Sequence, residues 1–301
     1  MRENTTDIIE ALPGAGKGQL RAGEKALAFA LFLLAAVAWW HPEAVALSVR
    51  ASLTTVAALF LVAVVALARA SWTPLVLARE FLPVPVVPFI FLHLGLLIPL
   101  VHPGHYDSQL EALDRWILGP ETQTALYNLP LPAWLADLLT LAYSTFFFLP
   151  IVLLVNLVRS RDPHLPRVAS TIIITFLVSY AGYFLVPAYG PRAFVAKERY
   201  ATLPEGLLGA KIRLVLDTWE KTKTDAFPSG HTMVTLAVLY CARRRSPRLY
   251  TALLPVGALL IAATVLLTYH YVVDVLAAIP FLLLSLGLAR WWCGPLPSRP
   301  A

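Results

Sequence analysis

The sequence predicts an all-α protein, a polytopic transmembrane helical bundle. Of its 301 residues, 58% are hydrophobic and 14% are charged, and the mean hydropathy is +0.69. Soluble domains are about 45–50% apolar and about 25% charged. The apolar residues also form long runs between charged or proline-rich breaks, and a helix needs about 20 residues to cross about 30 Å of hydrocarbon. We therefore expect an integral membrane protein whose surroundings are the bilayer, with no nucleic acid as a partner.

About eight membrane spans are expected, within a range of six to eight. The apolar runs lie near residues 26–41, 51–68, 84–101, 133–157, 168–187, 230–242, 250–268 and 271–290. The first run is short unless it continues past His41 and Pro42. The sixth is shorter still, so its start at Ser229 should lie below the membrane surface. Such closely spaced helices predict one transmembrane domain over residues 25–293, between tails of residues 1–24 and 294–301.

Basic residues predict the orientation, because Lys and Arg are enriched in cytoplasmic loops. A cytoplasmic N-terminus places most of them inside, including the run Arg243–Arg245, and an even number of spans puts both termini in the cytoplasm. The first 25 residues lack a cleavable signal pattern, so we expect them to remain as a tail. The outer loop of residues 188–228 is itself basic and needs another explanation for its cations, which are Arg192, Lys197, Arg199, Lys211, Arg213, Lys221 and Lys223.

Ionisable side chains at membrane depth are costly and usually functional, and three stretches carry them on the predicted outer face. The first is FLVPAYGPRAF, residues 184–194, where Pro187, Gly190 and Pro191 end the fifth run. Arg192 then presents a guanidinium group whose planar fork suits a phosphate or a carboxylate. The alternative is an arginine that only reaches lipid head groups at the interface.

The second stretch is AFPSGHTMVTL, residues 226–236. Pro228 interrupts the preceding chain, Ser229 is a good N-cap, and Gly230 and His231 occupy the first helical turn. A helix N-terminus has free N–H groups and a partial positive charge, so it favours anions. The serine hydroxyl and the imidazole would add to such an anion site. The alternative is an ordinary capped helix with an interfacial histidine.

The third stretch is ATVLLTYHYVVDVLAA, in which His270 and Asp274 lie four residues apart. On a helix the two side chains would share one face, and the carboxylate would hold one imidazole nitrogen while the other points away. That arrangement makes a nucleophile or a base. A buried pair that locks two helices is the alternative. A metal site is less favoured because an arginine belongs to the same constellation, so no metal or cofactor is expected.

These stretches, in this order and on one membrane face, resemble the type 2 phosphatidic acid phosphatase superfamily of membrane lipid phosphatases and phosphotransferases. That family's pattern is Lys, six residues, Arg-Pro; then Pro-Ser-Gly-His; then Ser-Arg, five residues, His, three residues, Asp. The second motif is present in full and the third in its second half, as Pro228, Ser229, Gly230 and His231 and then His270 and Asp274. The resemblance covers roughly residues 185–275.

The chain departs from the pattern at the family lysine, at the proline after the arginine and at the Ser-Arg pair, where it has Leu185, Ala193 and Ala263-Thr264. Two phosphate-binding cations are therefore missing or come from elsewhere, and Lys221 and Lys223 are candidates. Thr264 stands where the phosphatases carry arginine, and the surrounding residues resemble inositol phosphorylceramide and sphingomyelin synthases. Gly230, in contrast, is the residue typical of the phosphatases.

The resemblance implies a mechanism that uses a phosphohistidine. His270, oriented by Asp274, would attack phosphorus, and His231 would protonate the leaving oxygen. Positive charge and N–H groups would neutralise the equatorial oxygens. The residues expected to bind the phosphate are Arg192, Ser229, Gly230 and Lys223.

The implied substrate is a phospholipid or lipid phosphate at the outer face of the cell membrane. Transfer of a phosphoinositol-type head group to a lipid alcohol is favoured. Hydrolysis of phosphatidic acid, phosphatidylglycerophosphate or polyprenyl pyrophosphate is the alternative, and a bundle that only binds or transports lipid is the non-enzymatic one. Two acidic residues in the loop VHPGHYDSQLEALDRWILG, Asp107 and Asp114, would contact a polar head group or cap helices at the interface.

Overall fold

The computed structural model describes residues 18–204, 206, 209–219 and 222–298. The regular elements of this part of the chain are all helices, apart from one isolated bridge between Ala188 and Asp225. The helices are α2 (Ala22–Trp40), α3 (Leu47–Ala68), α4 (Thr73–Phe81), α5 (Pro83–Val101), α6 (Asp107–Leu118), α7 (Pro120–Tyr127), α8 (Ala133–Ser144), α9 (Phe148–Arg159), α10 (Leu165–Leu185), η1 (Pro191–Ala193), α11 (Lys197–Ala201), α12 (Gly209–Trp219), α13 (Gly230–Arg245), α14 (Pro247–Leu266) and α15 (Val272–Cys293).

The predicted polytopic bundle is confirmed. In the described residues, six helical segments are long and apolar enough to cross a membrane, namely α2, α3, α4 with α5, α10, α14 and α15. Helices α8 and α9 are bent by 52° at a short break and make a seventh segment if they are counted as one span. The predicted sixth run is α13, which has only 16 residues. The short α13 and the bend between α8 and α9 together explain why the expected eight segments give six or seven full spans.

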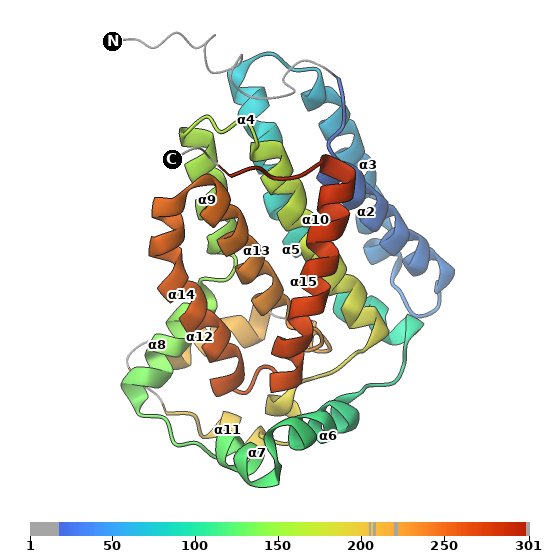
Figure 1. Cartoon of the computed structure of the whole chain (residues 1–301). Helices are drawn as coiled ribbons and strands as arrows, with labels where there is room; N and C mark the ends of the chain where they lie inside the picture. Colours follow the sequence, from blue (N-terminus) through green and yellow to red (C-terminus); the bar gives the residue numbers. More distant parts are fainter. Residues whose placement is uncertain (1–17, 205, 207–208, 220–221, 299–301) are drawn as a thin grey trace.

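Helix α10 is the centre of the bundle (Figure 1). It contacts α2, α5, α9, α13 and α15, and 67% of its span window is buried, against 28% for α3 at the edge. Its hydroxyl side chains are compatible with this position because they bond to carbonyl groups of their own helix: Thr171 to Arg167, Thr175 to Thr171 and Ser179 to Phe176. A polar group without a partner would be costly at this depth.

Both ends of the described chain lie at one end of the bundle, and α6 and α7 lie at the other (Figure 1). Buried ion pairs stabilise the end that carries the termini. Arg245 makes a two-pronged pair with Asp162, at 2.9–3.2 Å between nitrogen and oxygen. Arg79 pairs with Glu24 at 2.7 Å. Guanidinium and carboxylate groups that face each other this way satisfy several donors at once, which permits their burial.

Arg245→Ala is expected to lower the free energy of unfolding by about 3–5 kcal/mol, because it leaves the Asp162 carboxylate buried without its main partner. The control is Arg115→Ala, which removes the pair with Glu111, where the arginine side chain is 58% exposed. Loss of an exposed pair should cost at most about 1 kcal/mol. Unfolding of the purified protein in one detergent measures both, and equal losses would contradict the prediction.

Candidate active site

The three predicted polar stretches meet at the end of the bundle opposite the termini. Backbone hydrogen bonds join them: Ala226 N–H donates to the Ala188 carbonyl at 3.0 Å, Arg192 N–H to the Thr268 carbonyl at 2.8 Å, and Ser229 N–H to the Asp274 carbonyl at 3.1 Å. The loop after α10, the start of α13 and the turn between α14 and α15 therefore form one unit. The prediction that these stretches share a face agrees with this arrangement.

Two imidazole rings face each other at the centre of this unit. His231 lies in the first turn of α13, and His270 lies in the turn before α15. The His270 Nε2 and His231 Nδ1 atoms are 3.4 Å apart. The His231 ring is stacked on Tyr143 and packs against Phe146, with ring centroids at 4.5 and 4.2 Å. These aromatic contacts orient the His231 ring, and two proton-exchanging nitrogens lie side by side.

The other ring nitrogen of His270 is held differently from the sequence-based expectation. His270 precedes α15, so it does not share a helical face with Asp274. Its Nδ1 atom lies 2.8 Å from the Ala226 carbonyl oxygen and 3.4 Å from the Asp274 carboxylate. Asp274 instead accepts the Tyr271 N–H at 2.8 Å. A carbonyl only accepts, so Nδ1 carries the proton and the lone pair of the neutral ring is on Nε2, the atom that faces His231.

Arg192 lies beside this pair, where its guanidinium group covers the face of Tyr269 at 4.4 Å. It lines a small polar pocket together with His270, Tyr143, Tyr189, Asp225, Ala226 and Tyr269. The predicted cation and the predicted nucleophile therefore line the same pocket. A guanidinium held against an aromatic ring keeps its planar donors in one orientation, which suits an anion with several oxygens.

The other predicted phosphate-binding residues differ in position. Ser229 is buried and its hydroxyl oxygen caps α13 by accepting the Thr232 N–H at 3.3 Å, so it lines neither cavity. Gly230 lines the larger cavity, and a Cβ atom there would collide with the Tyr183 hydroxyl. Lys223 is exposed and lines neither cavity. Lys221 lies outside the described residues.

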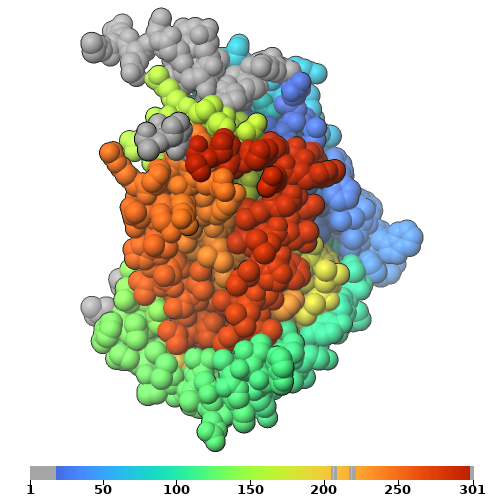
Figure 2. Space-filling model, viewed as in Figure 1, coloured from blue at the N-terminus to red at the C-terminus, as the bar shows by residue number. Residues whose placement is uncertain are grey.

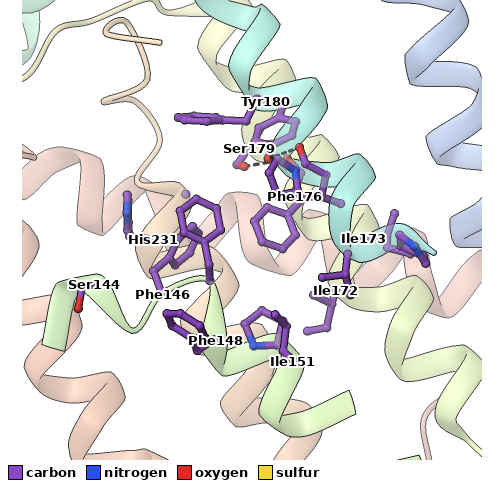
Figure 3. A pocket seen from close by; sticks show the side chains of 18 of the residues that line it. Ser144, Phe146, Phe148, Ile151, Ile172, Ile173, Phe176, Ser179, Tyr180 and His231 are labelled. Atoms are coloured by element: carbon purple, nitrogen blue, oxygen red, sulfur yellow. Dashed lines mark hydrogen bonds between the residues drawn. The ribbon is translucent and has the colours of Figure 1, made fainter. Parts of the chain in front are cut away.

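The larger cavity is an apolar groove of about 720 Å³. Its walls come from α5, α8, α9, α10 and α12, and His231 and Gly230 lie at one end of it. Figure 3 shows aromatic and aliphatic side chains, among them Phe146, Ile151 and Phe176, gathered beside His231. The groove follows α10 from Val168 to Tyr183, which is about 22 Å at 1.5 Å per residue.

Two residues that the sequence did not indicate join the groove to the polar pocket. Tyr143 and Asp225 line both cavities. Asp225 immediately precedes the second stretch, so its place in the sequence could have indicated that it belongs to the site. Tyr143 belongs to an apolar run, and nothing in the sequence separates it from the other aromatic residues there. No three His, Cys, Asp or Glu side chains of the described residues converge as metal ligands would.

Comparison with known proteins agrees with this geometry. The family model described as the PAP2 superfamily matches residues 108–288, which include both histidines and more than half of the chain. The chain belongs to the PAP2 superfamily. It is also 30% identical, over 189 residues, to a PA-phosphatase related-family protein of Dictyostelium discoideum. The match covers 56% of this chain and a third of that relative. No solved structure matches.

Membership of the PAP2 superfamily supports a phosphatase-type enzyme. In this PAP2 protein, two positions at which the family pattern has a cation carry an uncharged side chain. Leu185 is 64% exposed at the end of α10, and Thr264 is buried with its hydroxyl donating to the Ile261 carbonyl. Among the described residues that line the two cavities, the cations are Arg192 and Lys211. The polar pocket therefore has less positive charge than the family pattern implies.

Gly190→Ala is expected to displace the Arg192 loop. Gly190 has φ +84°, and an added Cβ atom would collide with the Tyr269 carbonyl. Gly119→Ala is the matched control, because Gly119 has φ +80° and open space around it. Each substitution should cost about 1–3 kcal/mol of backbone strain. Only Gly190→Ala should also weaken binding of inorganic phosphate, by about 10-fold or more, as measured by calorimetry. Equal affinities in the two variants would contradict this role of the loop.

Proposed function

We propose that this protein is a lipid phosphotransferase that moves a phosphate-containing head group from a phospholipid to a lipid alcohol through a phosphohistidine. The observation that carries the proposal is the pair of facing imidazoles, 3.4 Å apart, between an arginine-lined polar pocket and an apolar groove. Hydrolysis of a lipid phosphate is the second candidate. It differs only in the final acceptor, which is water.

The first step forms a bond between His270 Nε2 and phosphorus. The substrate phosphate replaces the contact between the two rings, so that each ring lies beside it. As the nitrogen lone pair attacks, the bond from phosphorus to the lipid oxygen breaks, and His231 as imidazolium gives that oxygen its proton. The Ala226 carbonyl and the nearby Asp274 carboxylate stabilise the positive charge that develops on the His270 ring.

The second step reverses these roles. His231, now neutral, takes the proton from the hydroxyl of the acceptor, and the acceptor oxygen attacks phosphorus. The bond between phosphorus and His270 then breaks, and its electron pair returns to Nε2. An alcohol acceptor produces a new phosphodiester, and water produces a phosphate monoester or free phosphate. The same groups thus serve both directions, as reversibility requires.

The charge of the polar pocket favours the transferase. A phosphate monoester carries about −1.5 to −2 at pH 7, whereas a phosphodiester carries a single negative charge. The pocket offers one guanidinium, from Arg192, and also contains the carboxyl group of Asp225. Positions 185 and 264, where the family pattern has cations, carry leucine and threonine. One positive charge suits a phosphodiester better than a dianion.

The groove supports a lipid substrate. Its volume of about 720 Å³ is within the usual range of about 300–1,000 Å³ for ligand sites. Polar side chains, including Tyr143, Asp225 and Lys211, line it together with His231, whereas most of the lining is apolar. A lipid whose phosphate meets His270 would leave its chain in the groove. Burial of that chain provides binding energy that a water-soluble phosphate cannot use.

The proposed orientation places the site at the outer face of the cell membrane. Helix α13 begins at the site and finishes with Arg243–Arg245. These arginines lie on the side of the bundle where the described chain starts and stops (Figure 1). A cluster of arginines at a helix end is typical of the cytoplasmic side. Both termini would then be cytoplasmic.

His270→Ala and His231→Ala are expected to reduce turnover by at least about 1,000-fold while the protein remains folded. The control is His93→Ala in α5, because the His93 ring contacts the Phe89 carbonyl of its own helix and lines neither cavity. Purified protein is incubated with a panel of phospholipids, with and without diacylglycerol, ceramide and inositol. A new phospholipid supports the transferase, and free phosphate without an alcohol supports the phosphatase. No product from any substrate would contradict both.

Ile151→Trp should fill part of the groove and lower kcat/KM for a long-chain substrate by about 10-fold, or about 1.4 kcal/mol. Turnover of a short-chain analogue with the same head group should stay within about 2-fold, because its chain does not reach that part. Val152→Trp is the matched control on the same helix, since Val152 is 42% exposed and lies outside the groove lining. The same loss with both chain lengths would argue against a chain in the groove.

A further inference from the structure

Helix α6 carries two buried carboxylates that the proposed mechanism does not use. Asp107 and Asp114 are seven residues apart, which is about two helical turns, so they lie on one face of α6. Both are fully buried, and neither lines the groove or the polar pocket. In Figure 2 the green segment that contains α6 and α7 closes the end of the bundle where the site lies. A buried carboxylate requires several donors, and most of the donors here come from the loops of the site and the start of α15.

Asp107 joins two of these loops. It accepts the Tyr189 N–H at 3.0 Å and the Gly190 N–H at 2.9 Å, in the loop that carries Arg192. It also accepts the Tyr271 hydroxyl at 3.0 Å, from the residue after His270. His105 Nδ1 lies 3.1 Å from the same carboxylate at the surface. One side chain thus bonds to residues two and three positions before the predicted phosphate cation and to the residue directly after the predicted nucleophile.

Asp114 holds the start of α15. It accepts the Val272 N–H at 2.9 Å and the Val273 N–H at 2.7 Å. These are N–H groups of the first helical turn, which have no partner inside the helix. The carboxylate also accepts the Tyr127 hydroxyl from α7 at 2.8 Å. Burial and the nearby Asp114 raise the pKa of Tyr127, so this hydroxyl stays protonated and keeps donating.

We propose that Asp107 and Asp114 are positioning residues that set the Arg192 loop and the His270 turn in register for phosphoryl transfer. Each acts mainly through backbone N–H groups, and the N–H groups of the two carboxylates lie in different parts of the site. Asp107 acts on the position of Arg192 and therefore on phosphate binding. Asp114 acts on the direction of His270 and therefore on the chemical step. This proposal rests on the proposed function for its kinetic consequences, and on the hydrogen bonds alone for its structural ones.

The test compares Asp107→Asn and Asp114→Asn in the full chain. An amide has one accepting oxygen, and its NH₂ group would face a backbone N–H, so each variant keeps the size of the side chain and loses acceptors. Asp107→Asn should raise KM, and the Kd for inorganic phosphate, by about 10-fold or more. Asp114→Asn should lower kcat by about 10- to 100-fold with KM nearly unchanged, as small misplacements of a catalytic group do.

Glu111→Gln is the matched control, because Glu111 lies on the same helix and its carboxylate pairs with Arg115. It should leave KM, kcat and phosphate binding unchanged. Tyr271→Phe and Tyr127→Phe each remove one hydrogen bond from Asp107 and Asp114, respectively. Tyr271→Phe should raise KM and Tyr127→Phe should lower kcat, each by less than the corresponding Asn variant. The two Phe variants replace the Asn variants if these do not fold.

Two results would overturn the proposal. In the first, both Asn variants lose active protein without a change in KM, kcat or phosphate affinity. In the second, backbone hydrogen exchange at Tyr189 and Gly190 in Asp107→Asn, and at Val272 and Val273 in Asp114→Asn, equals that of the wild type. If the wild type turns over no lipid, the proposed function fails, and hydrogen exchange and inorganic phosphate binding still decide on the positioning role.

Discussion

The hydrogen bond between His270 Nδ1 and the Ala226 carbonyl is the contact on which the site depends. It joins the turn before α15 to the segment before α13, and it determines which nitrogen of His270 carries the proton. The lone pair of the neutral ring is then on Nε2, which faces His231 Nδ1 at 3.4 Å. A carbonyl held by the backbone is a more rigid acceptor than a side chain. The Asp274 carboxylate, at 3.4 Å from Nδ1, adds negative charge beside the ring without being its nearest partner.

The remaining structure brings polar chemistry and apolar surface together at one end of the bundle. Helix α10 contributes to both, because it lines the groove along its length and ends at the loop that carries Arg192. The bilayer demands that backbone polar groups be satisfied within the protein. Irregular loops at the site meet this demand by bonding to one another and to the carboxylates of α6. The same bonds that make the loops stable in a membrane also hold the reactive groups in place.

Charge balance distinguishes this PAP2 protein from its family pattern. Arg192 provides the guanidinium of the polar pocket, and Asp225 lines that pocket with it. Leu185 and Thr264 replace two cations of the pattern, and the exposed Lys223 does not take their place in either cavity. A pocket with so few cations neutralises the charge of a singly charged phosphodiester more completely than that of a dianionic phosphate monoester. These few positions therefore support the phosphodiester substrate of the proposed function.

The sequence alone determined the membrane bundle, because long apolar runs have no stable alternative in water, and it predicted Arg192, His231 and His270 as site residues through motifs with known chemistry. It also predicted the cap at Ser229, since capping depends on local residues. Only the tertiary structure decided what holds His270, because the Ala226 carbonyl is 44 residues away and backbone groups leave no sequence signal. The same is true of Asp107 and Asp114, whose partners in the site loops and at the start of α15 lie 82 to 164 residues further along the chain. Local patterns specify helices and caps, whereas contacts between distant loops depend on how the whole bundle packs.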